Sequence, residues 1–321
     1  MRCVRFVTAA AALTMLAAPV FAQQIVLKGV SGFPEGTLYS SKFEAFVKQI
    51  NESGLLRIHY LGGAPKVMAP FEVVKNLRDG VVDIASVTGA FYTNLVPEAD
   101  ALKLLEISMA DLRKNGGLAY VNKIHNEKAK AFYLARIFNY ETFHIYLNKE
   151  IKHADFAGLK IRVTSLSRAM VEKLGGTGVN SAPAEVYTLV ERNTVDGYAW
   201  SARGIFDFSW DKVTKYRIDP PFYNADIQLL VNLDTWTRKL NDRQRKVLTD
   251  VAMAIETDTL DKPLNEAERK KQSDAGIKSI RFSPAEEKKY LQIAHDAAWE
   301  SVVKTSPEHG PKLREFFTKK N

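Results

Sequence analysis

Residues 24–87 alternate between two hydrophobic periodicities, and this alternation limits the possible folds more than any other feature of the chain. Residues 24–30, 55–60 and 81–87 have the short apolar pattern of strands. Between them, apolar residues recur at helical spacing. Strands and helices in alternation predict a parallel sheet with crossover helices. Ligands of such sheets bind beyond the carboxyl ends of the strands, a position that here belongs to Phe33, Thr88 and Phe91.

The same alternation starts again in the second half of the chain, where we expect strands at residues 138–147, 159–163, from 179 and at 195–198, with helices at 166–174 and 185–190. The apolar run at 227–232 predicts a strand that returns to the first unit. A long helix is expected over about 241–269, opened by Asn241 and Gln244 in capping positions, and another after Ser283. The sequence therefore predicts two α/β units between which the chain crosses more than once.

The N-terminus has the pattern of a secretory signal peptide. Arg2 and Arg5 precede an apolar stretch over residues 6–20, and small residues lead up to Ala22. The stretch is too short to span a bilayer. We predict cleavage after Ala22, so that the signal peptide is residues 1–22. The only cysteine, Cys3, lies inside it, and an exported chain without disulfides depends on its hydrophobic core for stability.

Charge and composition argue against nucleic acid as a partner. The whole chain has a formal charge of +8, and removal of the two signal arginines leaves 43 basic and 37 acidic residues, or +6. The lysines of the C-terminal third fall among glutamates at helical spacing, as on solvated helix faces. No arginine or lysine cluster is interleaved with stacking aromatic residues.

Motifs for catalysis, metal binding and phosphate binding are absent from the sequence. The six histidines have no metal-ligand spacing, and the glycines at 175, 176 and 178 lack the lysine of a phosphate loop. No nucleophile is placed with a base. An exported chain of this kind is better interpreted as a binding protein than as an enzyme, with no cofactor and no metal.

Arg162 lies in the strand-like run GLKIRV at residues 158–163, where periodicity would accept an apolar residue. A second short strand, 195–198, is followed by Trp200. Arginine presents a rigid fork of donors that fits a carboxylate through two parallel hydrogen bonds. Arg162 and Trp200 are therefore candidates for half of an anion-binding pocket. The alternatives are a structural ion pair of Arg162 with Asp155 or Asp196, and a plain core position for Trp200.

The region from Gly158 to Tyr216 closely resembles a known family. The motifs DFAGLKIR at 155–162, LGG at 174–176, AEVY at 184–187 and VDG at 195–197 are similar to those of the solute-binding subunit of tripartite ATP-independent periplasmic (TRAP) transporters, the DctP-like type. The block LRDGVVDI at 77–84 and residues 231–240 extend the resemblance along the chain.

The resemblance implies a bilobal periplasmic-binding-protein fold, with two α/β domains, a hinge, long C-terminal helices and a cleft that closes over a small organic acid. We assign residues 23–139 plus 226–267 to the first lobe and 140–225 plus 268–321 to the second. The implied partners are the ligand and the membrane subunits of a TRAP transporter, and the implied state is a periplasmic monomer or weak dimer. The remaining alternatives are a receptor for a sensor kinase and a secreted enzyme on the same fold.

Arg162 occupies the family position that pairs with the ligand carboxylate, but two departures limit the comparison. Ala199-Trp200 replaces the usual Glu-Asn, and Ser201 follows where some relatives have a metal-binding Glu. The position of a second family arginine is held by His144, while Arg203, near the same edge, is a candidate for either binding or a surface role. One strong anion anchor beside a tryptophan wall favours a monocarboxylate with an apolar or aromatic body.

Overall fold

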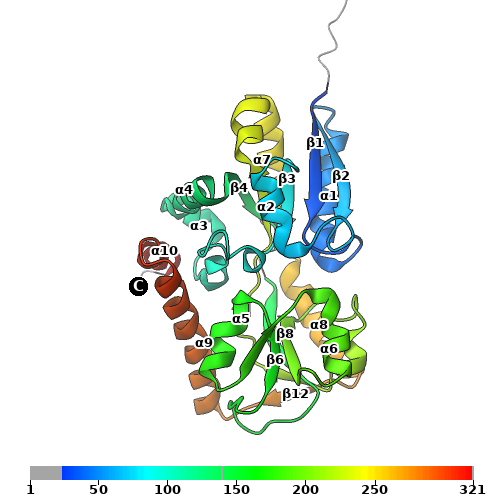
Figure 1. The fold of residues 1–321 in the computed structure, drawn as a ribbon, viewed down its shortest axis with the longest axis vertical. Coiled ribbons are helices and arrows are strands. Elements are labelled where there is room, and N and C mark those ends of the chain that lie inside the picture. The colour runs from blue at the N-terminus through cyan, green and yellow to red at the C-terminus, as the bar shows by residue number, and fades with distance from the viewer. Residues whose placement is uncertain (1–23, 139, 320–321) are drawn as a thin grey trace, which may run out of the picture.

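The computed structural model describes residues 24–138 and 140–319, so the predicted signal peptide lies outside the described residues. Two mixed sheets form two lobes, one above the other in Figure 1. No helix among the described residues is long and apolar enough to cross a membrane.

The first lobe is built on a five-stranded sheet of order β2-β1-β3-β11-β4. Strands β1 and β2 and strands β1 and β3 pair in parallel, whereas β11 is antiparallel to both of its neighbours. This confirms that residues 227–232 return to the first unit. The strands are β1 (Val26–Ser31), β2 (Arg57–Gly63), β3 (Ile84–Val87), β4 (Ala131–Arg136) and β11 (Gln228–Asn232).

Most helices of this lobe pack an apolar stripe against its sheet, whereas the helix at Met109–Lys114 packs on the helix at Gly117–Ala129. In the first helix of the lobe, Tyr39, Phe43, Phe46, Val47 and Ile50 are buried at helical spacing, as the sequence predicts. The helices are α1 (Leu38–Glu52), α2 (Val73–Arg78), α3 (Met109–Lys114), α4 (Gly117–Ala129) and α7 (Asp242–Glu256).

The second lobe is built on a seven-stranded sheet of order β12-β9-β5-β8-β6-β7, with β10 paired to β5. Parallel β6-β8 pairing and antiparallel β5-β8 pairing place Arg162 and Trp200 on adjacent strands. The strands are β5 (Thr142–Leu147), β6 (Lys160–Val163), β7 (Thr177–Asn180), β8 (Gly197–Ser201), β9 (Tyr216–Asp219), β10 (Tyr223–Asn224) and β12 (Lys278–Arg281).

The second lobe carries α5 (Ser165–Lys173), α6 (Val186–Glu191) and α8 (Asp261–Asp274). The long helix α9 (Pro284–Thr305) packs against α5 and runs up to α10 (Gly310–Phe317), which contacts α4 of the first lobe. Ser283 caps α9 by accepting a hydrogen bond from the amide of Glu286, so the predicted capping position is confirmed.

The single long helix predicted over 241–269 is wrong, because the structure has α7 and α8 with a break at residues 257–260. Pro263 explains the break: proline has no amide hydrogen, so it fits in the first turn of a new helix and not in the interior of a continuous one. The Oδ1 atom of Asp258 also accepts a hydrogen bond from the amide of Leu260 inside the break.

Candidate functional site

A cavity lies where the strand ends of the two lobes meet. It is lined by residues that follow β1 and β3 in the first lobe and by residues on β5, β6 and β8 in the second, and the space between the lining atoms is about 320 Å³ when space open to solvent is included. Two residues of the crossing segment before β11 complete the wall. The lining residues are Phe33, Tyr39, Thr88, Ala90, Phe91, Phe143, Arg162, Thr164, Leu166, Trp200, Ala225 and Ile227.

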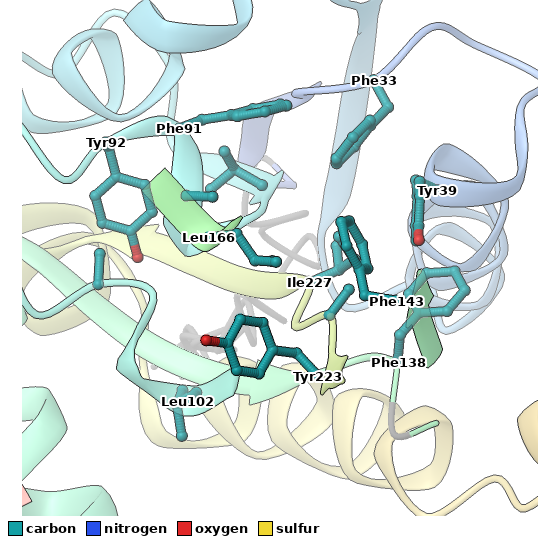
Figure 2. Close-up of a cluster of buried hydrophobic side chains, with 14 of the residues drawn as sticks. Phe33, Tyr39, Phe91, Tyr92, Leu102, Phe138, Phe143, Leu166, Tyr223 and Ile227 are labelled. Atoms are coloured by element: carbon teal, nitrogen blue, oxygen red, sulfur yellow. The ribbon is translucent and has the colours of Figure 1, made fainter. Parts of the chain in front are cut away.

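The wall of the cavity is largely aromatic, and its rings come from both lobes. Figure 2 shows Phe33, Tyr39 and Phe91 gathered on one side, with Phe143 beside them. The ring centroids of Phe33 and Phe91 are 5.3 Å apart, and those of Tyr39 and Trp200 are 5.6 Å apart across the two lobes. Such tilted and edge-to-face pairs are favourable ring arrangements. The cavity therefore offers an apolar surface to whatever it binds.

Arg162 is the charged residue of this wall, and its side chain is only 1% exposed. Its Nε and Nη2 atoms both donate to the carbonyl oxygen of Ser181, which follows β7; the Nε–O distance is 3.1 Å. Among the described residues, no carboxylate lies within ion-pair distance of the guanidinium and no acceptor meets Nη1. The bonds to Ser181 thus hold the Nε–Nη2 edge of the guanidinium. The remaining N–H groups, at the Nη1–Nη2 end, are available to a ligand.

The structural ion pair considered from sequence is not formed. Asp155 accepts from the amide of Ala157, 2.9 Å away. Asp196 pairs with Lys149 at 2.7 Å and also accepts from the amide of Lys160. Both carboxylates are engaged away from Arg162, so neither compensates its charge.

Burial without a carboxylate partner leaves Arg162 in an unfavourable environment for a cation. Burial lowers the pKa of the guanidinium to about 9, and the negative charge of Glu185 opposes that shift. The ring of Trp200 gives some compensation, since its centroid lies 5.7 Å from the guanidinium carbon. A carboxylate at the free end of Arg162 would supply the missing charge.

Few other polar groups face this site. Thr164 stands two residues after Arg162, on the same side of the chain, and its side chain makes no capping bond at the start of α5. Thr88 accepts from the amide of Ala90, which leaves its hydroxyl hydrogen available. Among the described residues, no group of three or more histidine, cysteine, aspartate or glutamate side chains is arranged to hold a metal ion. Tyr39 and Trp200 also line the cavity, and the Oη atom of the first and the Nε1 atom of the second are buried without a hydrogen-bond partner among the described residues. The arrangement can therefore bind one anionic group and offers few further polar partners.

The family model for bacterial extracellular solute-binding proteins of family 7 (DctP) matches residues 32–305 of the chain. The chain belongs to the DctP family. It is therefore a solute-binding protein and not an enzyme, as the absence of catalytic motifs predicts.

Solved structures of DctP-type proteins share the fold. An extracytoplasmic solute receptor of Bordetella pertussis, solved with pyroglutamic acid, has a TM-score of 0.79 at 15% identity, covering 92% of this chain and 99% of that one. A TRAP periplasmic solute-binding protein of Sulfitobacter sp. NAS-14.1, solved with β-D-galacturonate, has a TM-score of 0.78 at 21% identity, covering 91% and 99%. One from Desulfovibrio salexigens, with orotic acid, has a TM-score of 0.77 at 16% identity, covering 92% and 97%.

The DctP fold brings five of the seven site residues predicted from sequence to one cavity. These are Phe33, Thr88, Phe91, Arg162 and Trp200. Two of them, Arg162 and Trp200, come from the second lobe, and the other three come from the first.

His144 and Arg203 do not line the cavity. Successive side chains of a strand point to opposite faces, and Phe143 takes the cavity face of β5, so His144 points away. Its Nδ1 atom lies 3.2 Å from Asp219, and burial lowers its pKa while Asp219 opposes the shift. Arg203 is buried in ion pairs with Glu141 and Asp261. The structure gives both residues partners within the protein instead of a place in the cavity.

Seven lining residues were not singled out as site residues from the sequence. Leu166, Tyr39 and Ile227 were placed on helices and strands by their apolar spacing, which does not tell a core position from a cavity wall. The sequence does carry a signal for Thr164, because this residue directly follows the strand of Arg162 and stands two residues from it, which puts both side chains on the same side of the chain. The remaining three are Ala90, Phe143 and Ala225.

Proposed function

We propose that the protein is a periplasmic receptor for a small monocarboxylate with an apolar or aromatic body, which it delivers to the membrane subunits of a TRAP transporter. The observation that carries this proposal is Arg162, a buried cation without a carboxylate partner among the described residues, set in an aromatic cavity. The ligand carboxylate would accept hydrogen bonds from the Nη1–Nη2 end of the fork.

The apolar wall supports a ligand with few hydroxyl groups. Related proteins have been solved with galacturonate, pyroglutamic acid and orotic acid, all of which are organic acids. A sugar acid needs a hydrogen-bond partner for each buried hydroxyl, and an unpaired one costs about 1–3 kcal/mol. Thr88, Thr164 and Tyr39 offer hydroxyl groups here, whereas Phe33, Phe91 and Phe143 offer none.

Ligand binding and cleft closure should be coupled through the charge of Arg162. In a closed, empty cleft, the guanidinium loses its water and gains no counter-charge, which disfavours that state. A bound carboxylate removes this penalty, so the ligand favours the closed state over the open one. The apolar walls of both lobes then cover the ligand body.

Export to the periplasm rests on the predicted signal peptide with cleavage after Ala22, and the transport partner rests on membership of the family. N-terminal mass analysis of the protein from a periplasmic extract tests the first point. A chain that begins at Gln23 is expected, and a chain that retains Met1 would contradict it.

The ligand class can be tested by a thermal-shift screen of the mature, dialysed protein. We expect 3-phenylpropionate and 4-methylvalerate to raise the melting temperature, since a ligand at 100 times its Kd stabilises by about 2.7 kcal/mol. The matched amide, 3-phenylpropionamide, lacks the anion and should have no effect. Stabilisation by succinate or galacturonate, with none by the apolar acids, would contradict the proposed ligand class.

A further inference from the structure

Polar contacts join the two lobes at one rim of the cavity. The Nζ atom of Lys103 lies 3.1 Å from Oδ2 of Asp100 and donates to the carbonyl oxygen of Leu166 at 2.9 Å. The hydroxyl oxygen of Ser165 lies 2.9 Å from the same Oδ2 atom and 3.2 Å from the carbonyl oxygen of Ala90, so its single hydrogen has both as acceptors. Five residues thus form a connected set of bonds across the cleft.

The two sides of this set belong to different lobes. Lys103 is part of the short helix η3 (Ala101–Leu104), and Ala99, two residues before this helix, accepts a hydrogen bond from Gln228 of β11 in the first sheet. Ser165 and Leu166 form the first turn of α5, which follows β6 of the second sheet. Opening of the cleft would separate the lysine and the aspartate from that turn.

The same turn of α5 forms part of the ligand cavity. Thr164 and Leu166 line the cavity, and Thr164 stands two residues from Arg162. Leu166 therefore contributes its side chain to the ligand wall and its carbonyl oxygen to Lys103. The position of this wall depends on the contact with the other lobe.

Burial makes the contact sensitive to closure. The side chains of Lys103 and Asp100 are 4% and 5% exposed, and the ring centroid of Tyr223 lies 5.3 Å from the lysine nitrogen. A buried ammonium needs all of its partners, because hydrogen bonds to a charged group are stronger than those between neutral groups and their loss leaves the charge unpaired. In the open state, water would replace the carbonyl of Leu166 as the partner of Lys103 and the hydroxyl of Ser165 as the partner of Asp100.

We propose that Lys103 and Asp100 are positioning residues for ligand capture: they hold the first turn of α5 against the ligand only when the cleft is closed. This inference rests on the proposed function. The pair does not touch the ligand, and it acts by slowing the reopening of the cleft and hence the release of the acid.

Two variants test the proposal, and a third is the control. Lys103→Met removes the ammonium, and Ser165→Ala removes only a hydroxyl, so that it preserves the fold. Lys128→Met breaks a similar pair in the first lobe, where Lys128 lies 2.6 Å from buried Glu98 and outside the cavity wall. For the tightest acid of the thermal-shift screen, the dissociation rate should rise about tenfold or more in Lys103→Met, less in Ser165→Ala, and not in the control.

A purely structural role would lower stability in the absence of acid and leave the dissociation rate unchanged. The acid-free melting temperature of Ser165→Ala should stay close to that of the parent protein, because the contact forms only on closure. Unchanged dissociation rates in both Lys103→Met and Ser165→Ala would overturn the proposal.

A second readout separates failure of this inference from failure of the proposed function. Spin labels on cysteines introduced at the exposed positions Lys75 and Lys173, one in each lobe, report the distance across the cleft, with Cys3 replaced by serine. Even if no acid binds, the acid-free protein should sample the closed state as a minor short-distance population, and Lys103→Met should reduce that population while the main, open population stays unchanged. Identical distributions in the parent and in Lys103→Met, in every condition, would overturn the proposal.

Discussion

Arg162 is oriented before any ligand arrives. The carbonyl of Ser181 holds the Nε–Nη2 edge, so the side chain has little rotamer freedom left to lose on binding. Immobilising a flexible side chain costs about 0.5–1.5 kcal/mol at an interface. A fixed fork also sets the direction from which a carboxylate approaches. Affinity for a small acid can therefore be high even though few polar groups contribute.

Replacement of Arg162 should have opposite effects on binding and on stability. Arg162→Met removes the charge that disfavours the closed, empty cleft, so the acid-free protein should close more readily and unfold at a higher temperature. Affinity for the acid should fall by about 3 kcal/mol, or about 100-fold, and Arg162→Lys should recover little because an ammonium lacks the fork.

Calorimetry and thermal melts measure the two effects, with Arg192→Met, on the exposed end of α6, as the control. Near-parent affinity in Arg162→Met would remove Arg162 from the site.

Trp200 should decide which acids fit. Trp200→Phe keeps an aromatic ring but shortens the wall and removes the contact with the guanidinium, so affinity should fall by about 1 kcal/mol and larger acids should gain relative to smaller ones. Trp236→Phe is the control, since Trp236 stacks on Phe132 outside the cavity. Calorimetry with a series of acids of increasing size measures the change, and an unchanged order of preference would count against this role.

At the scale of elements, the loop after β8 caps a helix of the other lobe. Asp207 accepts a hydrogen bond from the amide of Leu38 at 2.7 Å, at the start of α1. Thr37 occupies the capping position, but its hydroxyl donates to Pro34 instead. A carboxylate at a helix N-terminus is favoured both as an acceptor and by the helix dipole. The second lobe thus completes a helix of the first lobe in the closed arrangement.

Asp207→Ala should therefore weaken ligand binding more than it weakens the acid-free protein. The lost cap is worth about 1 kcal/mol in the closed state, which corresponds to about a fivefold loss of affinity. Asp211→Ala, in the same loop region but without a bond to α1, is the control. Titration calorimetry and acid-free melts provide the comparison, and a drop in melting temperature without a change in affinity would contradict the expectation.

Local patterns predicted most strands and the helix at 38–52, because their apolar residues repeat without interruption. They did not predict α3, α4 and β4, where buried residues alternate with polar ones such as His125. The break between α7 and α8 was not predicted, because the capping signal of Asn241 shows where a helix begins but not where it ends, and Pro263 is the residue that marks the new start. For the site, Arg162 and Trp200 stood out as unusual residues in strands. Phe143, Ala225 and Ile227 did not, because their role depends on the other lobe.

At the scale of the whole molecule, stability should decrease in acid partly through His125. This histidine is 2% exposed, and burial lowers its pKa from 6.5 to about 4. The unfolded chain therefore takes up the proton first as pH falls, and the free energy of unfolding decreases between pH 6.5 and about 4. The full contribution is about 3 kcal/mol.

Urea unfolding at pH 7.5 and pH 4.5 tests this expectation. The decrease between the two pH values should be smaller in His125→Gln than in the parent protein, by about 2 kcal/mol, because glutamine does not titrate. Equal decreases in the two proteins would show that other groups account for the acid sensitivity.

The contact of Trp200 with Arg162 has an optical consequence. An indole emits light whose wavelength and intensity depend on nearby charge, and Trp200 lies against a guanidinium that a carboxylate would neutralise. Capture of an acid should thus alter the intrinsic fluorescence of the protein without any attached dye. Because Arg162, which would bind the carboxylate, lies against Trp200, whose emission would change, the protein is a starting point for a fluorescent sensor of small organic acids.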